Sequence, residues 1–141
     1  MSPKGSEVTR SLNLPFKKVL LAYSGSEGSD RAAEVAKKLA EELYIITVVR
    51  IPEYVRGEEE ERERAREYYR PIVEKAKRRF GAREALIVFG NPAEEIVRVA
   101  EEIGADLIVL GVETKNPLMR KLGGVGDKVV DHAHCSVLVV R

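Results

Sequence analysis

The stretch "FGNPAEEIVRVAEEIGADLIVLG", residues 89–111, decides the fold. Asn91 is a typical helix N-cap, Pro92 suits the first helical position, and Glu94 completes the pattern of a capping box. A buried stripe at helical spacing follows, made of Ile96, Val97 and Ala100. Gly104 is the residue type that most often ends a helix. The apolar run that comes next, "ADLIVLG", has no polar alternation and predicts a strand covered on both faces.

The same alternation of apolar strand and amphipathic helix runs through the chain. Apolar runs predict strands at 17–23, 44–51, 85–89, 105–111 and 136–141. Helical periodicity predicts further helices from Asp30, within 57–84 and near 126–134. Strands that alternate with helices form right-handed β-α-β units around a parallel sheet. We therefore predict a single-domain α/β fold, with an open parallel sheet and helices on both of its faces.

Two of these helices have an extended apolar pattern. In the first, apolar residues recur at Ala32, Val35, Ala36, Leu39, Ala40 and Leu43. In the second, one stripe contains Ala65, Tyr68, Tyr69, Ile72, Val73, Ala76 and Phe80. Pro71 should kink this second helix or break it in two, because proline lacks the N–H that a helix interior needs. Its dense Glu and Arg residues indicate a solvated face with ion pairs rather than a nucleic-acid interface.

Composition narrows the class of protein. The 141 residues suffice for one domain, and a net charge of +1 gives no reason to expect nucleic acid or an anionic membrane as partner. The polar segment 1–15 is expected to be a flexible tail, and the lone Cys135 excludes an internal disulfide. No apolar run reaches transmembrane length. We expect a cytoplasmic protein, and the absence of glutamine together with many Glu, Lys and Arg residues is typical of thermophiles.

Several nucleotide-binding motifs are absent. The loop after the first strand has Gly25 and Gly28 but no G-x-G-x-x-G, and no P-loop sequence occurs anywhere. A phospho-receiver domain would need a carboxylate at the end of its accepting strand, and "IVFGNP" has none. In a doubly wound sheet, ligands bind where the strand order reverses. The first and fourth strands are the candidates, with loops "YSGSEGS" (23–29) and "GVETKNPLMRKLGG" (111–124).

Other reactive residues do not form a catalytic or metal pattern. His132, His134 and Cys135 are close in sequence, but positions i and i+2 at a helix end point to different faces, and the chain has no further histidine. Cys135 has no evident oriented base, and Ser24 and Ser26 have no Ser-His-Asp context. We therefore expect neither a metal site nor an enzyme.

Four segments together resemble the universal stress protein family. They are "VLLAYSGSEGSDRAAEVAKKLA", "IITVVRIPE", "FGNPAEEIVRVAEEIGADLIVLG" and "LGGVGDKVVDHAHCSVLVVR". The resemblance implies a domain over 16–141 with strand order 3-2-1-4-5 and four helices. It also implies a homodimer through the last strand, Ser136 to Val140; an apolar edge strand of this kind is suited to pairing.

Many members of that family bind ATP through G-x2-G-x9-G-[S/T] after the fourth strand, with an Asp at the end of the first strand. Here Gly111 is the first glycine, Thr114 replaces the second, and Gly124 is followed by Val125 in place of a hydroxyl residue. Ser24 stands where the Asp is common. The resemblance gives as candidate contacts Ala22, Tyr23, Ser24, Val48, Gly111, Glu113, Thr114, Gly123, Gly124 and Val125.

These departures weaken the motif without removing it. A lost hydroxyl donor to phosphate costs about 1–3 kcal/mol, and threonine at a glycine position costs about 1–2 kcal/mol more. Three functions stay open. The chain is a stress-response module that binds an adenine nucleotide, with Mg²⁺ if the ligand is ATP. Alternatively it is a nucleotide-free dimeric interaction protein. The third option is a slow ATPase, for which Glu113 or Asp127 would be the only base near the loop.

Overall fold

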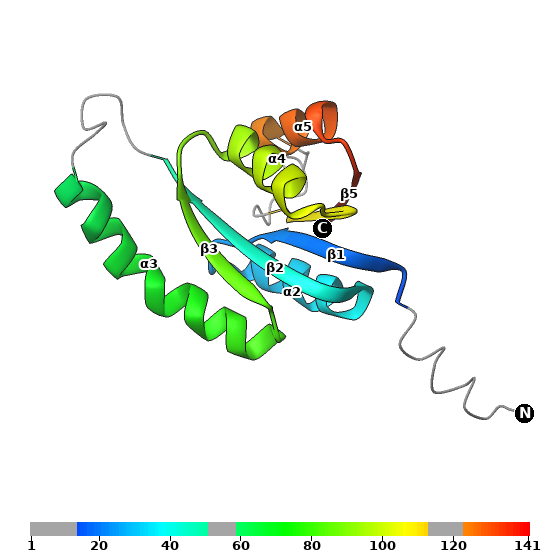
Figure 1. Ribbon diagram of the computed structural model, residues 1–141, viewed down its shortest axis with the longest axis horizontal. Helices are drawn as coiled ribbons and strands as arrows, with labels where there is room; N and C mark the ends of the chain where they lie inside the picture. Colours follow the sequence, from blue (N-terminus) through cyan, green and yellow to red (C-terminus); the bar gives the residue numbers. More distant parts are fainter. Residues whose placement is uncertain (1–13, 51–58, 113–122) are drawn as a thin grey trace, which may run out of the picture.

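Strands and helices alternate along the part of the chain that the computed structural model describes, residues 14–50, 59–112 and 123–141 (Figure 1). The strands are β1 (Phe16–Ala22), β2 (Ala40–Val49), β3 (Glu84–Phe89), β4 (Leu107–Gly111) and β5 (Ser136–Val140). The helices are α2 (Glu27–Leu39), α3 (Glu59–Phe80), α4 (Pro92–Ile103) and α5 (Gly123–His132). Nearly all of the predicted tail, residues 1–13, lies outside the described residues.

The five strands form one parallel sheet in the order β3-β2-β1-β4-β5, as predicted. In the centre, Leu20 of β1 lies opposite Tyr44 of β2 and Ile108 of β4. The chain builds outward from β1 through β2 to β3, and then returns to the other side of β1 for β4 and β5. The strand order therefore reverses between β1 and β4, which is where ligands bind in such sheets.

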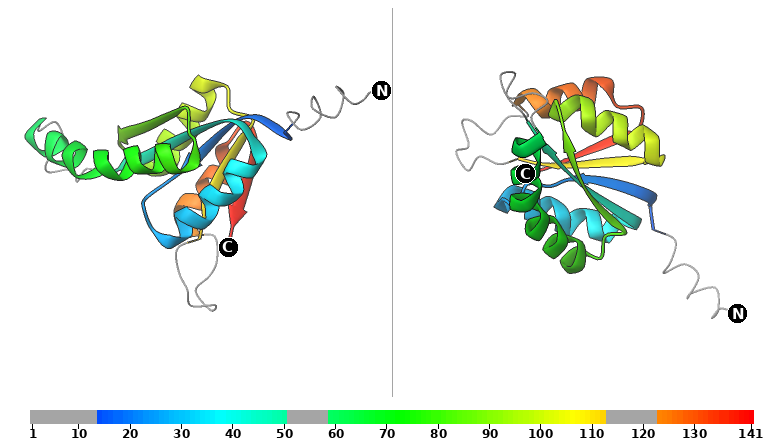
Figure 2. Two further views of the ribbon diagram at one scale, coloured as in Figure 1. Left: turned by 90° about the horizontal axis from the view of Figure 1, so that it is seen from below. Right: turned by 60° about the vertical axis from the view of Figure 1, so that its left-hand side comes forward.

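Helices cover both faces of the sheet, which explains the continuous apolar strands. Figure 2 shows α2 and α3 on one face, with α4 and α5 on the other. Val19, Leu20 and Leu21 are consecutive and all fully buried, although neighbouring side chains of a strand point to opposite faces. Two hydrophobic cores result: one packs against α2 and α3, and the other against α4 and α5.

The ends of α4 are as predicted. Asn91 Oδ1 accepts a hydrogen bond of 3.1 Å from the Glu94 backbone N–H, and Gly104 ends the helix in the left-handed conformation, with φ +73°. Both contacts are local, so a short sequence pattern suffices to specify them. The buried stripe differs from the prediction: Ala93 and Val99 are also buried, and Val97 is only half-buried.

Two other predictions about secondary structure were wrong. The helix α2 begins at Glu27 rather than Asp30 and ends at Leu39, so that Ala40 and Leu43 belong to β2, which begins four residues earlier than expected. The boundary was misplaced because the buried residues of α2 and those at the start of β2 together fit a single helical spacing. Of the two outcomes expected at Pro71, a kink or a break, the break does not occur: α3 is one helix with Pro71 inside it. Because Pro71 lies on the exposed side of the helix, the carbonyl group that loses its partner can turn to water.

The N-terminal half of α3 is more exposed than its apolar pattern indicated. Tyr68 is 67% exposed, and only Val73, Ala76 and Phe80 of the predicted stripe are buried. Arg66 pairs with Glu59 and Glu63 at 3.0 Å, as expected for a solvated charged face. Among the described helices, none combines the length and the apolar character that crossing a membrane requires.

Candidate functional site

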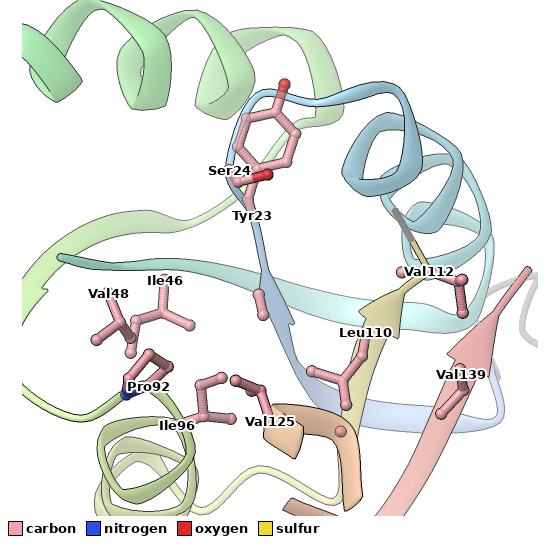
Figure 3. A pocket seen from close by; sticks show the side chains of 13 residues that line it. Tyr23, Ser24, Ile46, Val48, Pro92, Ile96, Leu110, Val112, Val125 and Val139 are labelled. Carbon is pink, nitrogen blue, oxygen red and sulfur yellow. The ribbon is translucent and has the colours of Figure 1, made fainter. Parts of the chain in front are cut away.

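A cleft of about 500 Å³ opens at the carboxyl ends of β1 and β4, where the strand order reverses. It is lined by Ala22, Tyr23, Ser24, Ile46, Val48, Pro92, Ile96, Leu110, Gly111, Val112, Val125, Gly126 and Val139. Several elements thus converge on one space (Figure 3). They are the ends of β1, β2, β4 and β5, the first turns of α4 and α5, and the residues that follow β1 and β4. Its size and position are those of a small-molecule site.

The cleft wall is mainly apolar. Figure 3 shows Ile46 and Val48 from β2 facing Pro92 and Ile96 from α4, with Val125 of α5 beside them. The ring of Tyr23 is directed away from this group. Ser24 therefore supplies the polar side chain of the described lining. Such a surface suits a flat, largely apolar group such as a nucleobase.

Tyr23 is held by a polar network on the opposite side of the β1 tip. Its hydroxyl donates a hydrogen bond of 2.6 Å to Asp30 Oδ1, and the Asp30 carboxylate lies 3.7 Å from Arg79. Burial first, and then the hydrogen bond to Asp30, raises the pKa of Tyr23 to about 12. The buried Thr47 hydroxyl donates to the Tyr23 carbonyl oxygen at 2.7 Å. These contacts fix the strand end from which Ser24 extends.

Ser24 belongs to a cluster of hydroxyl groups at the start of α2. Its Oγ lies 2.9 Å from Ser26 Oγ, and Ser26 caps α2 by accepting a hydrogen bond from the Ser29 backbone N–H. Gly25, between them, has φ +89°, and its N–H donates to Ser29 Oγ. The exposed Ser24 hydroxyl is thus placed at the cleft edge by a turn that is itself hydrogen-bonded.

The glycines after the fourth strand lie differently from the prediction. The helix α5 begins at Gly123 rather than near 126, so that Gly123 and Gly124 belong to its first turn. The first N–H groups of a helix have no intrahelical acceptor. Val125 carries one of these groups and lines the cleft beside Gly126. Gly111 is also required by packing, because a Cβ there would meet the backbone of Gly28.

Most of the candidate residues lie around this cleft. Six of the ten line it, namely Ala22, Tyr23, Ser24, Val48, Gly111 and Val125. Gly123 and Gly124 precede the lining residues in α5, whereas Glu113 and Thr114 lie outside the described residues. The sequence analysis missed Ile46, Pro92, Ile96, Leu110, Val112, Gly126 and Val139. Two signals in the sequence could have predicted these residues. One is the set of apolar residues at the ends of the strands beside the reversal of strand order, and the other is the first turn of α4.

The histidine–cysteine segment does not face the cleft. His134 Nδ1 lies 2.7 Å from the Glu101 carboxylate, and His132 Nδ1 lies 2.9 Å from the Lys128 carbonyl oxygen. The two rings thus have separate partners. Burial raises the pKa of the Cys135 thiol, which makes it less reactive at neutral pH.

The fold agrees with comparisons to known proteins. A family model described as the universal stress protein family matches residues 15–141. The chain belongs to the universal stress protein family. A curated universal stress protein of Thermus aquaticus is 38% identical over 144 residues, covering 89% of this chain and 99% of the relative.

Two solved structures extend this likeness. That of the hypothetical protein MJ0577 is 31% identical with a TM-score of 0.77, and the match covers 90% of this chain and 96% of that one. The universal stress protein from Archaeoglobus fulgidus in complex with dAMP is 25% identical with a TM-score of 0.61, covering 91% and 100% of the two chains. The universal stress protein fold is therefore shared along almost the whole chain.

Proposed function

We propose that this universal stress protein is a regulatory module of the stress response that binds an adenine nucleotide in the cleft between β1 and β4. The observation that carries the proposal is the position of the cleft, which combines an apolar wall at the reversal of strand order with the first turn of a helix. The family member bound to dAMP supports an adenine nucleotide as the ligand.

The base would lie against the apolar wall. Val48 and Ile96 are among the side chains on the two sides of the cleft, so a flat ring between them would lose most of its contact with water. Ser24, at the edge, can hydrogen-bond a ribose hydroxyl. The 5′-phosphate would then point to the first turn of α5, where N–H groups and the helix dipole favour an anion.

The first turn of α5 also limits the number of phosphate groups that the ligand can carry. Val125 places a methyl-bearing side chain where a hydroxyl would be useful, and the described lining contains no Lys or Arg. We infer that a monophosphate suits the described residues better than ATP. If ATP binds, its Mg²⁺ would be carried by the phosphates, because the described lining also contains no carboxylate.

We further propose that the protein binds without catalysing a reaction, in the cytoplasm. The described residues that line the cleft include no Asp, Glu, His or Cys to act as a base or nucleophile. This supports a binding module over a slow ATPase.

A homodimer through β5 is the expected assembly. Among the described strands, β5 pairs with β4 alone, and its Val137 to Val140 are half-buried rather than buried. Pairing of this edge with its copy would cover apolar side chains and satisfy backbone groups. The same surface favours the second candidate function, a dimeric interaction protein that binds no nucleotide.

Calorimetric titration with AMP, dAMP and Mg-ATP tests the proposal. We expect AMP and dAMP to bind, and Val48→Trp to abolish binding by filling the cleft. The control is Val49→Trp, because Val49 is next in the strand, points to the other face and does not line the cleft. Absence of binding to wild type at millimolar nucleotide would favour the nucleotide-free interaction protein.

A double variant tests the departures from the motif. Ser24→Asp with Val125→Ser restores both polar groups, and each charge-assisted hydrogen bond gained should raise the affinity for Mg-ATP about tenfold or more. No gain would mean that the backbone at the start of α5 does not present its N–H groups to phosphate.

A further inference from the structure

A second cavity, of about 320 Å³, lies on the opposite side of the β1 tip from the nucleotide cleft. The cleft is bordered by α4 and α5, whereas this cavity is bordered by α2 and α3, which cover the other face of the sheet. Tyr23 and Ser24 line both spaces. The two spaces therefore adjoin at these two residues.

The second cavity contains the cations that the cleft lacks. Lys75 and Arg79, one turn apart on α3, both line it. Lys75 is exposed and has no ion-pair partner among the residues that the structure describes. Arg79 lies 3.7 Å from both Asp30 and Glu34, which is an ion-pair distance but too long for a hydrogen bond. Both side chains thus have N–H donors available to an anion.

One carboxylate in the cavity is already engaged. Asp30 accepts the short hydrogen bond from Tyr23 and faces Arg79. Asp30 therefore neutralises part of the positive charge of Arg79, whereas the positive charge of Lys75 is not neutralised by it. Ser24, at the boundary between the two spaces, is uncharged and exposed. An anionic group on a ligand would meet no carboxylate where it crosses from the cleft.

Nucleotide sites of related topology show what such an arrangement selects. A carboxylate near the ribose favours free hydroxyl groups, whereas an arginine in that region accommodates a ribose phosphate. We propose that the ligand of this protein is an adenine nucleotide that carries a second phosphate on its ribose 2′- or 3′-hydroxyl, held by Lys75 and Arg79 beyond Ser24. The proposal rests on the proposed function, which places the base and the 5′-phosphate in the cleft.

Calorimetric titration with AMP, adenosine 2′,5′-bisphosphate and adenosine 3′,5′-bisphosphate tests the proposal. One or both bisphosphates should bind at least about tenfold more tightly than AMP, as expected for a charge-assisted contact. The two bisphosphates distinguish the ribose position. Lys75→Ala should remove this preference and leave the affinity for AMP unchanged, and Arg78→Ala, an exposed neighbour that does not line the cavity, should leave both unchanged.

A charge placed at the boundary gives a second test. Ser24→Asp should weaken binding of the bisphosphates relative to that of AMP, because the new carboxylate repels a ribose phosphate. If AMP binds and neither bisphosphate binds more tightly, the second site is refuted and the proposed function stands. Equal effects of Lys75→Ala and Arg78→Ala would also refute it. If no nucleotide binds, both proposals fail.

Discussion

Gly111 at the end of β4 lies so close to Gly28 of α2 that a Cβ built on Gly111 would come within 2.4 Å of the Gly28 carbonyl oxygen. The obstacle is backbone, which cannot rotate away as a side chain can. Gly111 is therefore needed for α2 to pack on the sheet, whatever its part in binding phosphate.

Gly111→Ala should lower the free energy of unfolding by about 1–3 kcal/mol or more, because α2 must shift to admit the methyl group. Gly124→Ala is the matched control: its Cβ would meet nothing within 4 Å, and alanine in a helix should add about 0.5–1 kcal/mol. Urea denaturation measures both. Equal stability of Gly111→Ala and wild type would contradict the close approach.

The contribution of the α4 cap to the free energy of unfolding should be measurable apart from that of neighbouring contacts. Asn91→Ala removes the acceptor of the Glu94 N–H and should cost about 1 kcal/mol of unfolding free energy. Asn91→Asp keeps an acceptor and should cost less. If both variants lose the same stability in urea denaturation, the loss does not come from the cap.

Tyr23 should make stability depend on alkaline pH. Its pKa is about 12 in the folded protein against 10.0 ordinarily, so the folded state holds this proton more tightly than the unfolded chain does. The resulting stabilisation is complete below pH 10 and is lost as the pH rises through about 12.

Tyr23→Phe removes this dependence. The stability difference between wild type and Tyr23→Phe, measured by urea denaturation, should therefore shrink across that pH interval. A difference that stays constant would mean that Tyr23 titrates normally. Asp30→Asn, which removes the anionic acceptor but not the burial, should lower the pKa of Tyr23 in a spectroscopic titration.

The proposed dimer interface is testable on the sheet edges. Val137→Lys puts a charge on the free edge strand β5 and should yield monomers in sedimentation experiments, since an edge lysine opposes strand pairing. Glu84→Lys puts the same residue on β3, the opposite edge, and should leave the assembly unchanged. Monomeric wild type, or dissociation by Glu84→Lys alone, would argue against β5 as the interface.

The features that the sequence predicted best depend on local chemistry or on simple periodicity. Asn91 and Gly104 were placed correctly because a cap involves residues a few positions apart. The strand order came with the family resemblance, and the apolar run at Val19 to Leu21 indicated burial on both faces. The start of β2 at Ala40 was missed because the buried faces of helix and strand continue one pattern across the boundary.

Features that depend on distant contacts were not predictable in the same way. Nothing local to Gly111 reveals that Gly28 approaches it, and Lys75 and Arg79 are separated from Ser24 by two elements in the chain. Their shared cavity exists only because α3 packs on the same face as α2. Gly123 and Gly124 were assigned to the loop after the fourth strand, yet the fold places them in the first turn of α5.

Amide chemical shifts recorded by NMR while AMP is added test the central claim most directly, because they locate the ligand without assuming its pose. We predict saturable shifts at Ser24, Val48, Gly111 and Gly126, with little change along the exposed N-terminal half of α3. Shifts confined to residues away from β1 and β4, or none at millimolar AMP, would contradict the account.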